Sequence, residues 1–533
     1  MTVYVPEDFS QTEVDVLRRY FTNLDGPVFA LVNLPEVVKG ALFARYSRSP
    51  KSLRRLFLDE FVGELDIQGD ESIDATIGLE RAEDLYEKVF LEYGDDSVAQ
   101  LGGVHLACEQ ASNILTKILE WGRLMSYLEQ STRYISYDAR LGGRYRFHRD
   151  PEVLASSFGT RYVGDMDRMF DAYSNAVGVV TDHVRDTISR QPEDSEFVYR
   201  QATRAKALDA TRGMLPAASL SNLGIYGSGQ GFESLLLRMR AHPLPEARRY
   251  ADLMLHELRK VIPSFLRRVD LPDRGGRWTE YLSATRTDTS DLVGQMFGDL
   301  PVDQVDEVEL IDFDPEAEDK LLAAICYSHS HLPESQLLER VRSLGADERI
   351  SLIRAYVGDR SNRRHKPGRA FERVDYRFDI LSDYGAFRDL QRHRLLTIEW
   401  QSLTPNHGYT RPDLIETSGA GALFDETMQR SAKLFDDLRG QFPQQAAYAV
   451  AMAYRLRYVM QFNAREAMHM LELRSSPQGH PSYRRVALEM HRLIAEKAGH
   501  YAVAAAMSHM TTAAPELERL ASERQAEARR GTV

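Results

Sequence analysis

Hydrophobic and polar positions follow one pattern twice along the chain. Residues 28–36 form an apolar, strand-like run that reaches Pro35, and a helical pattern follows it. The same order recurs at 308–316, where the run reaches Pro315. The prolines are 280 positions apart (315 − 35), and so are the valines that begin the two runs (308 − 28). This repetition predicts an internal duplication.

A second block repeats further along. The sequence Trp-Gly-Arg at 121–123 and the sequence Arg-His-Arg at 392–394 are each followed by a Gln-Ser pair that ends at Ser131 or Ser402. The spacing is 271 in both cases (392 − 121 and 402 − 131). Each block ends a helix that a short extended segment enters, and these segments are 104–108 and 376–380. The second block therefore extends the duplication.

The cationic cluster at 392–394 closes a segment with Ile380, Tyr384, Phe387 and Leu390 at the spacing of an amphipathic helix. Arginine forks bind phosphate or carboxylate oxygens two at a time, so the cluster is a candidate anion site. The alternative is that basic residues simply end a helix, where the macrodipole favours them.

Longer helical patterns lie between the blocks, at 166–188 and 422–438, and later helices at 231–240 and 463–474 end in arginine. An acidic, loop-like segment separates the two halves. The sequence predicts an α+β fold with more helix than strand, built twice. The expected division is a helical extension at 1–27, a first repeat at 28–297, a linker at 298–307 and a second repeat at 308–533.

The composition is that of an ordinary water-soluble chain, with 43% hydrophobic and 27% charged residues. No apolar run approaches the roughly 20 residues that span a bilayer, and the N-terminus does not resemble a signal peptide, so we expect a cytoplasmic protein. The net charge of −12 argues against a general nucleic-acid binder and favours a small anionic ligand. Cys108 and Cys326 are too few for a disulfide framework or a zinc site, and both lie in apolar runs typical of inert packing.

The two blocks resemble the two ends of the RHRxxSxNxxSxR signature of the ThyX family, the flavin-dependent thymidylate synthases. The C-terminal copy has the complete Arg-His-Arg, and the N-terminal copy matches the later positions. The matching residues of the N-terminal copy are Ser126, Glu129, Ser131 and Arg133. Substitutions interrupt both copies, and they are Leu128, Thr397, Glu399 and Thr404. The resemblance covers most of both halves and implies two tandem ThyX-like repeats, each with a small, mostly antiparallel sheet packed with long helices.

The split signature implies a division of labour between the repeats. The C-terminal repeat is expected to contact the flavin, and the candidates are Arg392, His393, Arg394, Asn463, Arg465 and His469. The N-terminal repeat is expected to bind the base and phosphate of a deoxynucleotide through Glu129, Ser131, Arg133 and Arg212, and Ser402 of the other repeat joins this set. Arg474 and Arg240 are the candidates for a further nucleotide contact at the catalytic centre.

Several of these residues have structural alternatives. Asn463 and Glu466 fit a helix-capping box, and His469 fits an ordinary helix surface. Ser131 and Arg133 fit a turn serine and a solvated arginine. No metal site is predicted, because His329 and His331 lack a nearby third ligand. His365 stands roughly where the family has a flavin-facing histidine, and Asp95 is at the corresponding place in the first repeat.

The resemblance implies a specific reaction. It is the reductive methylation of dUMP to dTMP with FAD, methylenetetrahydrofolate and NADPH, in which the flavin does the difficult chemistry and the protein binds and orients. One alternative is a flavoenzyme that modifies another pyrimidine nucleotide, and another is a non-catalytic nucleotide-binding paralogue. Because two repeats replace two subunits, a homodimer that imitates the family's tetramer is expected.

Overall fold

The computed structural model describes residues 4–62, 100 and 102–530, and it divides into two compact units. Asp95 therefore lies outside the described residues. The first unit comprises Met1–Asp171, Pro216–Val302 and Lys433–Ala449, and the second comprises Ala172–Leu215, Asp303–Ala432 and Val450–Val533. The division falls inside two long helices, α7 (Gly159–Thr187) and α17 (Gly421–Arg439). Each unit therefore contains a segment from the other half of the sequence.

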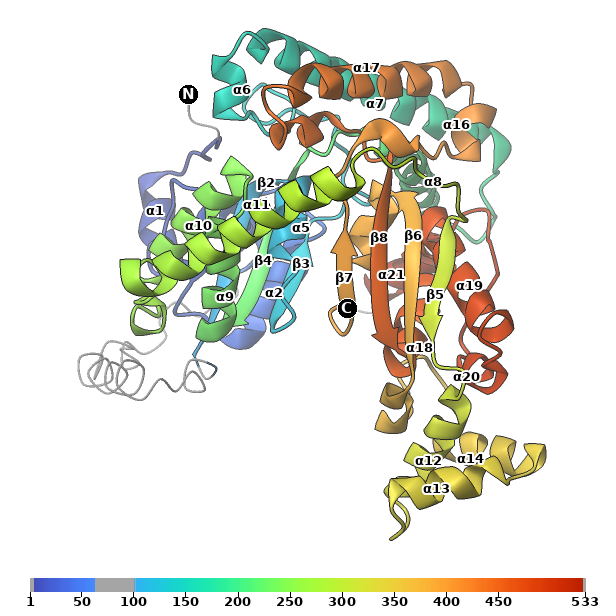
Figure 1. The fold of residues 1–533 in the computed structure, drawn as a ribbon. Coiled ribbons are helices and arrows are strands. Elements are labelled where there is room, and N and C mark those ends of the chain that lie inside the picture. Colours follow the sequence, from blue (N-terminus) through green and yellow to red (C-terminus); the bar gives the residue numbers. More distant parts are fainter. Residues whose placement is uncertain (1–3, 63–99, 101, 531–533) are drawn as a thin grey trace. The chain divides into compact units, whose positions relative to one another are not determined.

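Unit 1 is built around a four-stranded antiparallel sheet in the order β1-β2-β4-β3. Its strands are β1 (Val28–Leu31), β2 (Gly103–Ser112), β3 (Met125–Glu129) and β4 (Leu220–Ser228). Its helices are α1 (Gln11–Leu17), α2 (Glu36–Tyr46), α3 (Leu53–Glu60), α5 (Asn113–Leu119), α6 (Pro151–Ala155), α9 (Gly229–Arg240), α10 (Pro245–Leu258) and α11 (Arg277–Phe297). Helix α10 packs against β1, and α9 packs against α10 (Figure 1).

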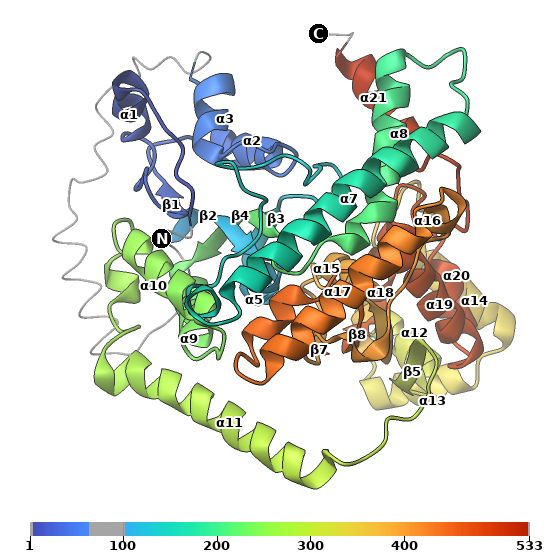
Figure 2. The same ribbon diagram turned by 90° about the horizontal axis from the view of Figure 1, so that it is seen from above.

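Unit 2 repeats the sheet in the order β5-β6-β8-β7, again antiparallel. Its strands are β5 (Val308–Phe313), β6 (Asp375–Asp383), β7 (Thr397–Trp400) and β8 (Arg455–Asn463). Its helices are α8 (Glu196–Thr211), α12 (Ala317–Tyr327), α13 (Glu334–Arg342), α14 (Ala346–Val357), α15 (Tyr384–Leu390), α16 (Asp413–Thr417), α18 (Ala464–Arg474), α19 (Pro481–Glu496), α20 (Tyr501–Ala506) and α21 (Leu520–Arg530). Helix α19 packs against β5 and β6, and α21 lies beside α8 (Figure 2).

The two sheets confirm the predicted α+β class and the predicted duplication, because their strand orders correspond position by position. The predicted strand runs at 28 and 308 begin β1 and β5, and the two later strand-to-helix segments are β2 with α5 and β6 with α15. Ile380 is an exception to the predicted helical spacing. It lies in β6, paired with Val308 and Tyr458, because sheet pairing outweighs its helical periodicity.

Specific contacts hold the segment that each unit receives from the other half of the sequence. In unit 2, the backbone N–H groups of Met452 and Ala453 donate to the carbonyls of Leu215 and Gly213, each at 2.9 Å. In unit 1, the hydroxyl of Tyr448 donates to Oε2 of Glu246 at 2.7 Å, and both side chains are buried. Each exchanged segment is therefore an integral part of the unit that it enters.

None of the helices within the described residues combines the length and the apolar character that a bilayer crossing requires.

Candidate functional site

The Arg-His-Arg block lies just after α15 in unit 2, and His393 is its most enclosed member. Its side chain is buried, whereas Arg392 is half-buried and Arg394 is exposed. The Nε of Arg474 donates to Nε2 of His393 at 3.0 Å, so this nitrogen is an acceptor. Nδ1 must then carry the proton, and it lies 3.1 Å from Oε1 of Glu466. The imidazole is thus fixed in one tautomer between an arginine and a carboxylate.

Helix α18 supplies the partners of His393. Its N-cap is Asn463, whose side-chain oxygen accepts from the N–H of Glu466 at 2.9 Å. Glu466 and His469 are three residues apart on one helix face, and Nδ1 of His469 lies 3.3 Å from both carboxylate oxygens of Glu466. The capping role of Asn463 is therefore present, but the Glu466 carboxylate contacts the two histidines.

Burial and hydrogen bonding set the charges in this network. Burial lowers the pKa of His393 to about 4, so the ring is neutral at pH 7. Burial opposes ionisation of Glu466, but hydrogen bonds from His393 and His469 hold its pKa at about 2. Burial also lowers the pKa of Arg474, and the nearby charge of Arg392 acts in the same direction. Arg474 stays protonated because an arginine pKa starts above 12.

Asp389 extends the network to a residue from the first half of the sequence. Its Oδ2 lies 3.2 Å from Nη1 of Arg212, and its Oδ1 lies 4.0 Å from Nη1 of Arg474. Arg212 is 4% exposed, and its Nη2 is buried without a hydrogen-bond partner among the described residues. A Cβ at Gly385 would lie 3.3 Å from the Arg212 guanidinium, so glycine permits this close approach.

We call the connected side chains of Arg212, Asp389, Arg392, His393, Glu466, His469 and Arg474 the α15–α18 cluster. The cluster contains three guanidinium groups, two carboxylates and the neutral ring of His393. One buried guanidinium nitrogen, Nη2 of Arg212, has no hydrogen-bond partner among the described residues. The cluster is chemically suited to a small anion, such as a phosphate group of a nucleotide or of a flavin.

The ligand types of His393, Glu466 and His469 also fit a metal, and one ligand atom of each lies within 4.8 Å of the others. However, Arg474 occupies Nε2 of His393, and Glu466 occupies its Nδ1. An arginine cation directly on the ring opposes a second cation there. The three residues are better described as a hydrogen-bonded network than as a metal centre.

Other predicted residues of unit 2 lie outside this cluster. Arg465 donates to the carbonyl of Pro367 at 2.9 Å and pairs with Glu372 at 3.4 Å. Ser402 is exposed just after β7. His365 contacts Ser361 and Asn362 in an exposed loop.

The remaining predicted residues lie in unit 1. Glu129 is buried, and its Oε2 lies 3.0 Å from Nζ of Lys117. The hydroxyl of Ser131 accepts from the N–H of Arg133 at 3.2 Å, which is the turn contact expected from the alternative. Arg240 pairs with Asp252 on the surface at 2.8 Å.

In the part of unit 1 that the structure describes, the His393–Glu466 pair has no counterpart. Gly122 is the equivalent of His393 (393 − 271), and Gly231 is the third residue after the α9 N-cap, as Glu466 is in α18. A Cβ at Gly122 would lie 2.6 Å from the hydroxyl of Tyr127, so a side chain there would require Tyr127 to move. Arg238 lies over the ring of Trp121 at 4.9 Å. The polar cluster of the described residues therefore exists in unit 2 only.

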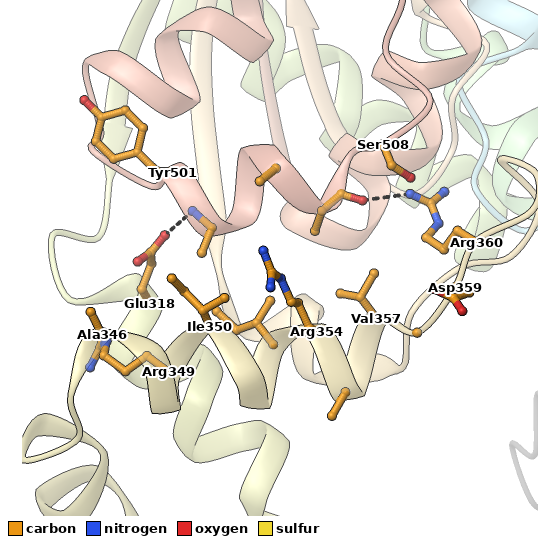
Figure 3. A pocket seen from close by; sticks show the side chains of 16 residues that line it. Glu318, Ala346, Arg349, Ile350, Arg354, Val357, Asp359, Arg360, Tyr501 and Ser508 are labelled. Carbon is orange, nitrogen blue, oxygen red and sulfur yellow. Dashed lines mark hydrogen bonds between the residues drawn. The ribbon is translucent and has the colours of Figure 1, made fainter.

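A separate pocket of about 1090 Å³ lies between α14 and α20 (Figure 3). Glu318 accepts from the N–H of Ala502 at one end, and Arg360 donates to the carbonyl of Ala506 at the other. None of the predicted site residues lines this pocket. The α15–α18 cluster is therefore the candidate site.

Sequence reasoning missed two members of the cluster in their present roles. Glu466 was expected only as a capping partner, and Asp389 carried no expectation. Their signals were a glutamate three residues before His469 on a helix, and an aspartate within one turn of the Arg-His-Arg block.

Comparisons with known proteins agree with the duplication. The family model described as "Thymidylate synthase complementing protein" matches residues 44–264 and again 309–499. The chain is 38% identical over 488 residues to a UPF0159 protein of Chlamydia muridarum, covering 91% of this chain and 92% of that relative. It is 38% identical over 486 residues to one of Chlamydia pneumoniae, covering 90% and 91%, and 31% identical over 516 residues to one of Thermoplasma acidophilum, covering 91% and 97%. The chain therefore belongs to the thymidylate synthase complementing protein family, ThyX, and carries the family domain twice.

Proposed function

We propose that this protein is a flavin-dependent enzyme that methylates dUMP to dTMP, with methylenetetrahydrofolate and NADPH as co-substrates. Membership of the family supports the reaction class, and the α15–α18 cluster supports the site. The main supporting observation is the composition of this cluster in unit 2. It contains a neutral histidine and three arginines, and one buried guanidinium nitrogen has no hydrogen-bond partner among the described residues. Such a set binds anionic groups without supplying a strong acid or base.

The residues of the cluster have distinct roles in this proposal. Bound FAD would supply the hydride and one-carbon chemistry. Arg392, His393 and Arg394 would hold the flavin, and His393 would present a fixed tautomer because Glu466 and Arg474 orient it. Arg212 would bind a nucleotide phosphate through its unpartnered Nη2.

The contribution of Arg212 supports the division of labour between repeats. Arg212 comes from the first half of the sequence but lies in unit 2 beside Asp389. Glu129, Ser131 and Arg133 remain candidates for the base and phosphate of the nucleotide, and the homodimer remains the proposed assembly.

A non-catalytic or altered paralogue is the second candidate. Thr397 and Thr404 replace signature residues, and Arg465 is engaged by the loop near Pro367. Under this alternative the cluster still binds a nucleotide, but no thymidylate is formed. Complementation of a thymidine-requiring bacterial strain separates the two candidates.

Nucleotide binding tests the role of Arg212. Arg212→Ala should weaken dUMP binding at least tenfold in titration calorimetry, because a charge-assisted bond to phosphate is worth about 1.5–3 kcal/mol. Arg212→Lys should retain part of the affinity, because the charge remains but the fork is lost.

The matched control is Arg519→Ala. Arg519 is a buried arginine of the same unit and pairs with Asp209 at 3.4 Å, outside the cluster. Arg519→Ala should lower the free energy of unfolding as Arg212→Ala does, while leaving the affinity for dUMP unchanged. Equal dUMP affinity in the wild type and Arg212→Ala would remove Arg212 from the proposed site.

A further inference from the structure

The pocket between α14 and α20 is a cavity that the proposed reaction does not use. Its volume is about 1090 Å³, close to the upper end of the roughly 300–1,000 Å³ that is typical of small-molecule sites. All of its lining residues belong to unit 2, and none belongs to the α15–α18 cluster. The pocket is therefore a separate candidate for ligand binding.

The sequences of the two helices explain why the space is open. Helix α14 lines the pocket with Ile350, Ile353 and Val357, which share one helix face. Helix α20 lines it with Tyr501 at one end and otherwise with alanines, which are Ala502, Ala505 and Ala506 (Figure 3). Alanine side chains end at Cβ, so they cannot close a gap that protein interiors normally fill. The result is a cavity with largely apolar walls.

Arg354 places a positive charge in this apolar cavity. It follows Ile353 on α14, and its guanidinium points toward α20, the helix that carries Tyr501 (Figure 3). The guanidinium has no hydrogen-bond or ion-pair partner within the described part of the chain. A guanidinium has five N–H donors in a planar fork, which matches the oxygens of a carboxylate, a sulfonate or a phosphate.

Two further arginines line the pocket, but protein carboxylates already hold them. Nη2 of Arg349 lies 2.6 Å from Oδ1 of Asp319. Arg360 donates to both carboxylate oxygens of Glu472, each at 2.6 Å, and this pair is buried. Arg354 is therefore the lining arginine that is available to a ligand.

The acidic residues of the pocket do not neutralise Arg354. Glu318 lies at one end, where its carboxylate accepts from the N–H of Ala502 at 2.8 Å (Figure 3). Asp359 is exposed toward the other end, and Val357 lies between it and Arg354 (Figure 3). Neither carboxylate pairs with Arg354, so the charge of this arginine remains available.

We infer that this pocket binds a small amphipathic anion, with an apolar body and one oxyanion group. The oxyanion pairs with Arg354, and the body lies between the apolar face of α14 and the alanines of α20. The inference does not rest on the proposed enzymatic function, because the pocket shares no residue with the α15–α18 cluster.

Two fluorescent probes test this inference on the full-length chain. Anilinonaphthalenesulfonate, ANS, has an aromatic body and one sulfonate, and phenylnaphthylamine has the same rings without the charge. Arg354→Ala should weaken ANS binding about three- to tenfold, because a charge-assisted hydrogen bond is lost at a partly exposed site. Binding of the neutral probe should not change. Arg354→Lys should retain part of the ANS affinity, because the charge remains.

A second variant fills the pocket without touching the charge. Ala505 is exposed within the pocket, so Ala505→Phe should weaken both probes while circular dichroism shows an unchanged fold. The matched control is Arg340→Ala. Arg340 is an exposed arginine in the last turn of α13, as Arg354 is in the last turn of α14, and it lies outside the pocket. This control should leave the affinity for both probes unchanged.

The comparison between variants isolates this pocket, because ANS sites elsewhere on the chain are common to all of them. Equal ANS affinity in the wild type and Arg354→Ala would overturn the inference. Equal loss of both probes in Arg354→Ala would also overturn it, because the arginine would then act through the fold and not through its charge. Unchanged binding of both probes in Ala505→Phe would show that neither occupies the cavity, and this too would overturn it. Flavin content, measured on the same samples, reports separately on the proposed function.

Discussion

At the scale of the residue, His393 shows how burial converts a titratable side chain into a fixed hydrogen-bonding group. Its ring is enclosed, accepts from Arg474 and faces the Glu466 carboxylate. Burial keeps the imidazole neutral at pH 7, whereas an exposed histidine beside a carboxylate would be partly charged. The ring can therefore act as an oriented donor and acceptor, which suits a group that positions a cofactor.

The pH dependence of stability tests this state. The pKa of His393 is about 4 in the folded chain and about 6.5 when unfolded, so only the unfolded chain takes up a proton as pH falls through this range. The free energy of unfolding should therefore decrease from pH 6.5 to 4, by about 3 kcal/mol from this group.

His393→Asn should flatten that part of the profile, measured by urea unfolding at several pH values. The contribution of Glu466 is separable, because its pKa of about 2 places its effect below the unfolded value near 4.5. Identical slopes in the wild type and the variant between pH 5 and 6.5 would show that His393 is not held neutral.

The Arg-His-Arg block could be found from the sequence because its residues are adjacent and the motif is specific. The partners of His393 could not be assigned in the same way. Glu466 and Arg474 are 73 and 81 positions away, and only the tertiary structure, in which side chains of α18 contact the segment after α15, brings them to the ring. Sequence spacing predicts neighbours within one helix but not between helices.

At the scale of the element, the exchange of segments between units is the main feature that the sequence did not predict. The duplication was visible because Val28 and Val308, which begin β1 and β5, are 280 positions apart, as are Pro35 and Pro315. The placement of α8 in unit 2 and of residues 433–449 in unit 1 depends on tertiary contacts that leave no periodic signal. Helix α11 was also missed, because a mostly polar stretch between Leu282 and Leu292 interrupts its apolar periodicity.

The hydrogen bond from Tyr448 to Glu246 offers a test of the placement of residues 433–449 in unit 1. Tyr448→Phe removes the hydroxyl that donates to the buried carboxylate of Glu246. The free energy of unfolding should fall by about 1–3 kcal/mol, because a buried charged acceptor loses one donor. Hydrogen exchange should become faster in α10 of unit 1, although Tyr448 belongs to the second half of the sequence.

Tyr501→Phe serves as the control for this change. Its ring is 66% exposed on α20, so removing the hydroxyl should change stability by less than about 0.5 kcal/mol. Unchanged exchange in α10 with Tyr448→Phe would mean that the segment is not held by this bond.

At the scale of the whole molecule, the two family domains no longer carry the same polar residues. Unit 2 holds the α15–α18 cluster, whereas unit 1 has Gly122 and Gly231 at the places of His393 and Glu466. A duplicated chain with two intact sites would bind two flavins. The asymmetry leads us to expect one.

The flavin content of the purified full-length chain is the most direct test of the central claim. After reconstitution with FAD and removal of excess, the absorbance of released flavin should give one FAD per chain. Arg392→Ala combined with Arg394→Ala should lower that ratio at least tenfold while the far-ultraviolet circular dichroism is unchanged. A wild type that binds no FAD would contradict the proposed cofactor, and a ratio of two would contradict the assignment of the site to unit 2 alone.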